Sequence, residues 1–491
     1  MNDQHDLEIM VVSRFPIILI ETHEELRCLE LLEQVCNLCS QAYFTWNVSQ
    51  GLRRNGRTDR VPETKIAPDL LRHIEATPQN GVYALLDFHP YLQDPVCVRL
   101  IKNITQTYHK TERTLVFISH QINLPPELER LAARFALSIP DQKGIRDLLK
   151  EEIKAWEVHN DKVTGQQEAV DALIQHLVGL SAEDARRMIR LALRDDGALT
   201  QSDIPRVLKA KHDLFGQSGM LHLELDTAQF SDVAGLKNLK RWLTQRKPAF
   251  LGAPEAAGLD TPKGIMLLGV QGCGKSLAAK AVAGAWNAPL LHLDFAKLYN
   301  KYIGETERNL REALKTAEAM APCILWIDEI EKSLSTESAD SDNGSSQRLL
   351  GSLLTWMAER KSRVFLVATA NDIQALPPEL VRKGRLDEIF FVDLPDAATR
   401  EEILRIHLAK RKQDPAQFDI SKLALACAGF SGAEIEQAVV SALYEAVAEK
   451  TPLSNTLLLA ELGRTRPLSV VMSEKLQALK AWAADRTVMA N

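Results

Sequence analysis

The sequence has no long apolar runs and no excess of positive charge. No apolar stretch approaches the ~18 residues that a bilayer-spanning helix needs. The formal net charge is −6, which gives no bulk attraction to nucleic acid or to anionic lipid. The start, MNDQHDLEIM, has no basic and apolar leader, so we expect no secretory signal. These absences predict a cytoplasmic protein with no membrane partner, and they disfavour nucleic acid as a partner.

Cysteine is scarce and scattered. The seven cysteines are an odd number, which suits reduced thiols better than a disulfide framework. Cys36 and Cys39 form a single C-x-x-C within a helical pattern, and we interpret them as core packing. A metal or redox role for this pair is the minor alternative. The cysteine content therefore points away from a secreted, disulfide-stapled fold.

A glycine-rich segment near the middle of the chain carries the clearest chemistry. Residues 269–276 read GVQGCGKS, the phosphate-binding pattern G-x-x-x-x-G-K-[ST]. The segment follows the apolar run 265–268 and precedes the helix-like stretch 277–286, so a chance glycine-rich turn is the weaker interpretation. Lys275 would contact the β- and γ-phosphates, and the Ser276 hydroxyl would ligate Mg²⁺. We expect these residues to surround the phosphates of a nucleoside triphosphate: Gly269, Val270, Gln271, Gly272, Cys273, Gly274, Lys275, Ser276 and Leu277.

A pair of carboxylates follows about fifty residues later. Residues 323–329 read CILWIDE, an apolar strand pattern that ends in Asp328 and Glu329. An Asp at the end of such a strand holds the Mg²⁺ shell, and a neighbouring carboxylate can polarise the attacking water. We assign these two roles to Asp328 and Glu329 respectively. The pair predicts hydrolysis as well as binding, whereas a solvated turn after a strand is the alternative.

Cys273 is unusual because it lies inside the phosphate-binding pattern. A helix N-terminus lowers the pKa of a thiol, so a reactive cysteine is one interpretation of this position. Oxidation there could block nucleotide binding. A small residue that only fills the loop is the preferred interpretation.

From Phe230 onward the motifs resemble those of the AAA clade of AAA+ ATPases, in family order. The matching segments are FSDVAGL (230–236), KYIGETERNLREAL (301–314), FLVATAND (365–372), PPELVRKGRLDEIFF (377–391) and GFSGAE (429–434). Within this clade the sequence is similar to the AAA open reading frame of algal plastid genomes and its bacterial relatives. That likeness lies in GVQGCGKS, in APCILWIDEIEK (321–332) and in RKGRLDEIFF.

The resemblance implies roles for residues outside the phosphate loop. It implies that Asn371 orients the attacking water and that Arg382 and Arg385 are arginine fingers, which reach the γ-phosphate of a neighbouring subunit. Tyr302 and Ile303 would form a loop in the central pore of a ring, with a hexamer as the expected form, and would grip a protein client. The further residues that it places around ATP are Asp232, Ala234, Gly235, His407 and Gly432.

The first 215 residues repeat the pattern of the second half without its phosphate loop. LPPELERL (124–131) parallels LPPELVRK (376–383), and GLSAEDARRMIRLAL (179–193) parallels GFSGAEIEQAVVSAL (429–443). YALLDF (83–88) lies where CILWIDE would. The counterpart of the phosphate strand, FPIILIETHEELR (15–27), has no glycine and carries acidic residues that would repel phosphate. We expect a second AAA-like module that keeps the scaffold and has lost the site.

These patterns predict an α/β protein of two tandem AAA+-like modules. Each module would contain a RecA-like parallel sheet with flanking helices and a small helical lid, and the first module would be degenerate. The expected domains are a degenerate core at 1–150, its lid and linker at 151–215, an ATPase core at 216–395 and a C-terminal lid at 396–491.

Three functions remain open at the level of the sequence. The first is a ring-shaped, ATP-hydrolysing remodeller of protein clients. The second is a nucleotide-dependent switch or assembly factor, in which the degenerate module docks partners. The third, nucleic-acid remodelling, is weaker because the chain is acidic and has no basic patch interleaved with aromatic residues.

Overall fold

The computed structural model describes residues 3–55, 60–195, 197–215, 219–225, 227–297, 305–334, 343–373, 376–382 and 384–491. The chain divides into two compact units, of which the first comprises Met1–Pro140 and Ser181–Glu183 and the second comprises Asp141–Leu180 and Asp184–Asn491. Among the described residues, no helix combines the length and the apolar character that a bilayer crossing requires.

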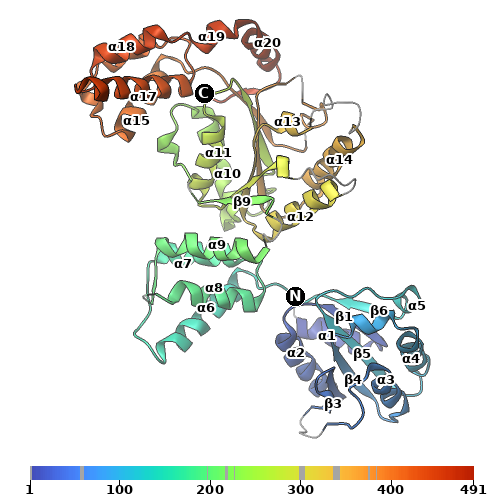
Figure 1. The fold of residues 1–491 in the computed structure, drawn as a ribbon. Coiled ribbons are helices and arrows are strands. Elements are labelled where there is room, and N and C mark those ends of the chain that lie inside the picture. The colour runs from blue at the N-terminus through green and yellow to red at the C-terminus, as the bar shows by residue number, and fades with distance from the viewer. Residues whose placement is uncertain are drawn as a thin grey trace. The chain divides into compact units, whose positions relative to one another are not determined.

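The first unit is a six-stranded sheet covered by helices on both faces (Figure 1). Its strands are β1 (Ile17–Glu21), β2 (Ala42–Asn47), β3 (Gly51–Arg54), β4 (Gly81–Leu86), β5 (Arg113–Ser119) and β6 (Ala132–Phe135). Its helices are α1 (Asp3–Val12), α2 (Glu25–Leu38), α3 (Ala67–Ala76), α4 (Pro95–Gln106) and α5 (Pro126–Glu129). The strand order is β3-β2-β4-β5-β1-β6, with β3 antiparallel to β2 and the other neighbours parallel.

The central strands of this sheet are apolar because both of their faces are covered. Every residue of β4 and β5 is buried, as expected for parallel strands beneath helices on two sides. One face packs on α3 and α4 through residues such as Leu70 and Ile101, and the other packs on α1 and α2 through residues such as Leu7 and Leu32. The unit therefore has a core on each side of its sheet.

The second unit begins with a small helical bundle. It consists of α6 (Gln142–Glu157), α7 (Gln167–Leu177), α8 (Ala182–Leu193) and α9 (Ile204–Phe215), with the short strands β7 (Thr164–Gly165) and β8 (Ala198–Leu199). The helices share an apolar cluster that includes Leu149, Ile174 and Ile189. Glu152 of α6 accepts hydrogen bonds from two arginines of α8, Arg186 at 2.9 Å and Arg190 at 2.7 and 3.0 Å.

The larger sheet of the second unit has seven strands. They are β9 (Leu221–Glu224), β10 (Gly264–Gly269), β11 (Leu290–Leu293), β12 (Cys323–Ile327), β13 (Val364–Ala370), β14 (Glu388–Val392) and β15 (Val488–Met489). The helices beside them are α10 (Lys237–Leu251), α11 (Lys275–Trp286), α12 (Glu305–Ala319), α13 (Ile330–Leu334) and α14 (Asn343–Glu359). The order is β15-β14-β10-β13-β12-β11-β9, and β9 is antiparallel to β11 while the other neighbours are parallel.

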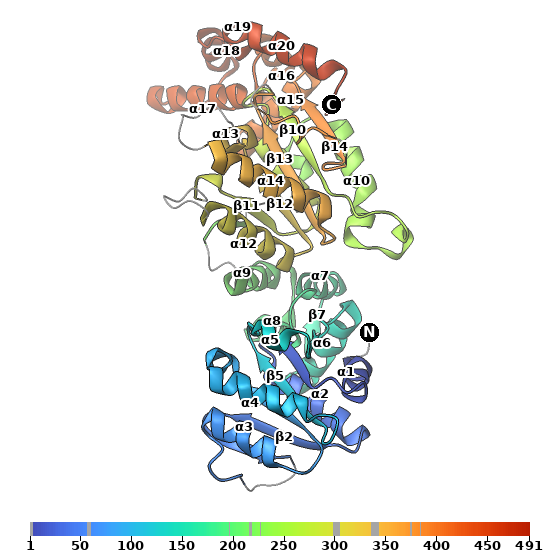
Figure 2. The same ribbon diagram turned by 90° about the vertical axis from the view of Figure 1, so that its right-hand side faces the viewer.

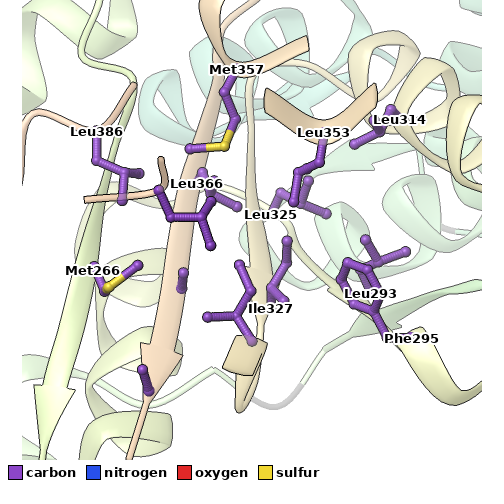
Figure 3. Close-up of a cluster of buried hydrophobic side chains, with 14 of the residues drawn as sticks. Met266, Leu293, Phe295, Leu314, Leu325, Ile327, Leu353, Met357, Leu366 and Leu386 are labelled. Atoms are coloured by element: carbon purple, nitrogen blue, oxygen red, sulfur yellow. The ribbon is translucent and has the colours of Figure 1, made fainter. Parts of the chain in front are cut away.

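Figure 1 shows α10 and α11 on one face of this sheet and α12, α13 and α14 on the other. Figure 3 shows the core on the second of these faces, where Leu353 and Met357 of α14 point toward Leu325 and Leu366 of the central strands. The opposite core includes Leu243 and Phe250 of α10 and Trp286 of α11. Because the central strands pair in parallel, their carboxyl ends meet along one edge of the sheet.

The two sheets share one topology. The order β2-β4-β5-β1-β6 in the first unit matches β11-β12-β13-β10-β14 in the second, strand for strand in chain order. The prediction of two tandem AAA+-like modules is therefore confirmed. The connections after the first strand differ: residues 22–24 join β1 to α2, whereas residues 270–274 join β10 to α11. The shorter connection has no room for the loop that would wrap a phosphate chain.

Helices of the C-terminal part gather at one end of the second sheet (Figure 2). They are α15 (Ala397–Lys410), α16 (Ile420–Ala426), α17 (Gly432–Glu449), α18 (Asn455–Arg464), α19 (Leu468–Val471) and α20 (Ser473–Ala484). The first four share their own apolar cluster. The tail differs from a simple lid extension, because Leu479 and Ala483 of α20 join the core of the sheet and β15 pairs with β14.

Candidate active site

A cavity of about 410 Å³ lies at the carboxyl edge of the second sheet, between the sheet and the C-terminal helices. This edge is where open α/β sheets bind their ligands. Most of the predicted site residues line it together: Asp232, Ala234, Gln271, Gly272, Cys273, Gly274, Lys275, Ser276, Leu277, Asp328, Glu329, Asn371, His407 and Gly432. Segments that are up to 200 residues apart in the sequence thus meet in one pocket.

The loop between β10 and α11 is shaped for an anion. Gly272 and Gly274 adopt φ of +77° and +84°, a region that residues with a Cβ rarely enter. Lys275 is buried and donates hydrogen bonds to the carbonyls of Gly269 and Val270, at 2.9 and 2.8 Å. Burial lowers the pKa of Lys275 below the ordinary lysine value. An entering phosphate would give this ammonium a better partner than the loop carbonyls, since an anion offers a charge-assisted bond.

Oxygen atoms converge beside the start of α11. The Ser276 hydroxyl lies 3.2 and 3.4 Å from the two carboxylate oxygens of Asp328, which follows β12. The Thr369 hydroxyl of β13 donates to Asp328 and accepts the backbone N–H of Glu329 at 2.9 Å. A hydroxyl and a carboxylate are hard oxygen donors of the kind that Mg²⁺ prefers. The residues present therefore fit a magnesium ion, which Ser276 and Asp328 would hold.

Glu329, the second carboxylate after β12, has different interaction partners from Asp328. Glu329 accepts a hydrogen bond of 2.9 Å from the Asn371 side chain, and its other oxygen pairs with Lys332 at 2.5 Å. Glu331 is almost fully buried and accepts the Asn371 backbone N–H at 2.8 Å. Burial raises the pKa of Glu331, and the charge of Glu329 acts in the same direction. Glu331 thereby fixes the backbone that presents Asn371 to Glu329.

The far end of the cavity is less polar. Ile403 and Ile406 of α15 line it beside His407. The His407 Nδ1 lies 3.4 Å from Glu436 of α17, and Arg411 binds the same carboxylate at 2.8 Å. Burial lowers the pKa of His407. The positive charge of Arg411 also lowers this pKa, whereas the negative charge of Glu436 raises it. A lowered pKa favours the uncharged imidazole, which suits contact with an uncharged base.

The structure does not support the alternative interpretation of Cys273 as a reactive thiol. Burial raises the pKa of the Cys273 thiol to about 12, although the charge of Lys275 opposes the shift. The sequence placed this cysteine at a helix N-terminus, where thiols acidify. Cys273 packs against the apolar core on the face of the sheet that α10 and α11 cover. This packing removes water from the thiol and outweighs the effect of the helix N-terminus. The remaining interpretation is a small residue that fills the loop.

Several predicted residues lie outside the wall of the cavity. Gly235 donates its backbone N–H to Glu402 at 2.9 Å. Arg382 is exposed, and Arg385 is half-buried with an enclosed Nη1 that has no hydrogen-bond partner within the described part of the chain. Tyr302 and Ile303, the expected pore loop, lie outside the described residues.

The sequence did not reveal other residues that line the cavity. Thr369 lies two positions before Asn371, and a hydroxyl at the end of a buried strand was the available signal. The C-terminal residues Met489, Ala490 and Asn491 also line it, and the Asn491 side chain donates to the Thr399 hydroxyl at 3.2 Å. No local pattern in the sequence marks this tail. The lid contacts the phosphate loop directly, since the Ala433 N–H donates to the Gly272 carbonyl at 3.0 Å.

Comparison with known proteins agrees with the resemblance to AAA ATPases that the sequence motifs indicate. The profile of the ATPase family associated with various cellular activities (AAA) matches residues 265–394. Profiles for the N-terminal and second domains of SpoVK-like AAA ATPases match residues 3–137 and 143–218, and the AAA+ lid domain matches 417–456.

Individual relatives match over different lengths. The AAA domain-containing protein ycf46 of Pyropia yezoensis is 35% identical over 99% of this chain and 98% of its own. The ycf46 protein of Guillardia theta is 34% identical over 98% of this chain and 94% of its own. The Cell division cycle protein 48 homolog of Archaeoglobus fulgidus is 34% identical over 44% of this chain and 30% of its own. The chain therefore belongs to the AAA ATPase family and, within it, to the AAA domain-containing proteins that match it along their full length.

Proposed function

We propose that the chain is an ATPase whose second unit binds ATP with Mg²⁺ and hydrolyses it. The observation that supports this most strongly is the convergence of three groups on one cavity. These are the loop around Lys275, the pair Ser276–Asp328 and the pair Glu329–Asn371. Each group answers one need of phosphoryl transfer, namely phosphate binding, metal binding and placement of the attacking water.

The role of each side chain follows from its surroundings. Lys275 neutralises phosphate charge from a dry position, where a cation interacts more strongly than it would in water. Ser276 and Asp328 would hold Mg²⁺, and the bound ion would stabilise the charge that develops on the phosphate oxygens. Glu329 accepts the proton of the attacking water, and the Asn371 amide keeps that carboxylate in place. His407 and the isoleucines of α15 would contact the adenine.

We propose that the active form is a homo-oligomeric ring, with six subunits as the expected number. Arg382 and Arg385 do not line the cavity of their own chain, which supports a contact between these arginines and the phosphate of a second copy. An arginine supplied in trans would stabilise the charge that develops during phosphoryl transfer. Hydrolysis would then depend on assembly.

Two biological functions are compatible with this ATPase activity. We favour remodelling of a protein client, with Tyr302 and Ile303 as the residues that grip it. The alternative is a nucleotide-dependent switch or assembly factor in which the first unit docks partners. The short connection at residues 22–24 favours this alternative, because it leaves the first unit with a complete scaffold and no phosphate loop.

Phosphate release by the purified full chain tests the proposed ATPase. Wild-type protein with Mg²⁺ and ATP should turn over, whereas removal of the ion by a chelator should stop turnover. Lys275→Ala should lose ATP binding and hydrolysis together, with a thermal melt as the control for folding. Turnover that survives in Lys275→Ala would place the activity elsewhere or in a contaminant.

A second assay separates remodelling from switching. An unfolded, casein-like polypeptide should stimulate ATP hydrolysis by the wild type, and Tyr302→Ala should abolish the stimulation while it leaves basal hydrolysis intact. Equal stimulation in both proteins, or none in either, favours the switch. Stimulation by single-stranded DNA in place of polypeptide would favour the nucleic-acid alternative.

A further inference from the structure

The first unit brings three metal-ligating side chains together at the edge of its sheet that corresponds to the nucleotide edge of the second unit. Asp87 follows β4, His89 lies two residues later, and His120 follows β5. One ligand atom from each of the three lies within 4.8 Å of the others. Within the described ranges of the chain, this is the group of three such residues that meets that distance. The three are exposed or half-exposed, so an ion could reach them from solvent.

We propose that Asp87, His89 and His120 bind a divalent transition-metal ion of the zinc type. Two imidazoles and one carboxylate are a donor set that suits zinc, since imidazole ligands favour such metals over Mg²⁺ or Ca²⁺. Zinc bonds of ~2.1 Å in a tetrahedral site would bring the ligand atoms about 3.4 Å apart. Because the ligand atoms lie within 4.8 Å of one another, movements of at most about 1.4 Å would bring them to this spacing, and the exposed side chains of Asp87 and His120 can make them.

Ser119 orients two of the proposed metal ligands by hydrogen bonding. Its hydroxyl lies 2.7 Å from His89 Nδ1 and donates at 3.3 Å to Asp87 Oδ1. A carboxylate only accepts, and a hydroxyl carries one proton, so the proton shared with His89 comes from its Nδ1. In the neutral form of His89, this tautomer leaves the lone pair on Nε2, the nitrogen that a metal needs. A ligating histidine that donates its other N–H to an oxygen is the usual supporting arrangement of metal sites.

Neighbouring groups add to the preference for a cation. The ring of His120 packs edge-on against His89 at a centroid distance of 4.9 Å and stacks on His23 at 6.2 Å. The carboxylate of Asp87 places negative charge at this edge, which would repel phosphate and would attract a metal ion.

The three ligands leave coordination positions open. Zinc sites with three protein ligands keep a position for water or for a further ligand, in contrast to closed structural sites with four. A carboxylate or an imidazole from a bound protein could occupy such an open coordination position. The first unit would then have exchanged a magnesium–nucleotide site for a metal site at the same edge of the same fold.

Zinc titration of the nucleotide-free full chain tests the proposal, with a chromophoric chelator as competitor. We expect one zinc ion per chain to bind at this site more tightly than at any other site on the protein. Asp87→Asn, His89→Gln and His120→Gln should each weaken binding roughly 100-fold or more, and Ser119→Ala should weaken it by roughly 10–100-fold. Millimolar Mg²⁺ should not displace the zinc.

Two matched variants distinguish this site from others. His73→Gln removes an exposed histidine of α3 from the same unit, and Cys39→Ser removes the half-buried thiol of the C-x-x-C pair. Both should keep the wild-type affinity, and thermal melts should show that all variants are folded. Zinc binding that is unchanged when Asp87, His89 and His120 are replaced together would overturn the proposal. Loss of binding in Cys39→Ser, or competition by Mg²⁺, would overturn it equally.

Discussion

The side-chain amide of Asn371 donates a 2.9 Å hydrogen bond to Glu329, and the two residues follow the carboxyl ends of neighbouring parallel strands, β13 and β12. The amide holds the carboxylate at the mouth of the phosphate loop, while Glu331 holds the Asn371 backbone from below. The arrangement places a candidate base and its orienting group on rigid strand ends. Positioning of this kind accounts for a large part of enzymatic rate enhancement.

We predict that Asn371→Ala binds ATP with near-normal affinity and hydrolyses it roughly 100-fold more slowly, because a base displaced by about an ångström loses that much rate. Lys275, Ser276 and Asp328 remain to bind the nucleotide. Equilibrium binding of a fluorescent ATP analogue and steady-state phosphate release measure the two effects. An Asn371→Ala enzyme with wild-type turnover would show that the hydrogen bond to Glu329 has no catalytic role.

Arg385→Ala should bind ATP and lose roughly 10³-fold or more in turnover if it acts as a finger in trans. Mixed with Lys275→Ala, the variant should recover part of the activity, because some interfaces then pair an intact loop with an intact arginine. The measurement is turnover as a function of mixing ratio, with sedimentation to follow assembly. A chain that stays monomeric and fully active at every concentration would eliminate the ring.

Cys273 should resist alkylation at pH 8. Its pKa is raised to about 12, so the reactive thiolate is scarce at any lower pH and becomes abundant only near that value. Timed iodoacetamide labelling followed by peptide mass spectrometry measures the rate, with glutathione as the reference thiol. Labelling of Cys273 as fast as that of glutathione would restore the reactive cysteine that the sequence suggested.

Glu152→Gln should destabilise the helical bundle by about 1.5–3 kcal/mol at pH 7, since it weakens charged hydrogen bonds to Arg190 and Arg186. Those bonds lower the pKa of Glu152 below its unfolded value, mainly through Arg190. The stabilisation is therefore present above the unfolded pKa and is lost as the pH falls through the folded pKa. Hydrogen exchange of the α6 and α8 amides at pH 7 and in acid follows both effects.

Glu151→Gln is the matched control for this prediction. Glu151 pairs with Arg186 at 2.6 Å but its side chain is 59% exposed, so its loss should cost at most about 1 kcal/mol. Equal effects of the two substitutions would show that burial of Glu152 adds nothing to the pair.

Local sequence patterns predicted those parts of the site that are formed by contiguous segments of the chain. The strand–loop–helix around Lys275 and the strand that ends at Asp328 are contiguous, so their spacing encodes their structure. The degenerate first unit was predictable because its segments repeat those of the second in the same order. The shared strand order shows that the repeat reflects a common fold.

Other features depend on which strands become neighbours, and the sequence does not encode that locally. Thr369 joins Asp328 to Glu329 only because β13 lies beside β12. Asp87 and His120 meet only because β4 pairs with β5. The pKa of Cys273 was mispredicted for the same reason, since the residues that bury it come from distant segments.

The most direct test of the ATPase is the separation of binding from hydrolysis in Glu329→Gln. The substitution keeps the side-chain shape and leaves Lys275, Ser276 and Asp328 in place, but it removes the base. The account predicts ATP affinity close to that of the wild type and phosphate release slower by roughly 10²–10⁴-fold. Near wild-type phosphate release by Glu329→Gln would contradict it.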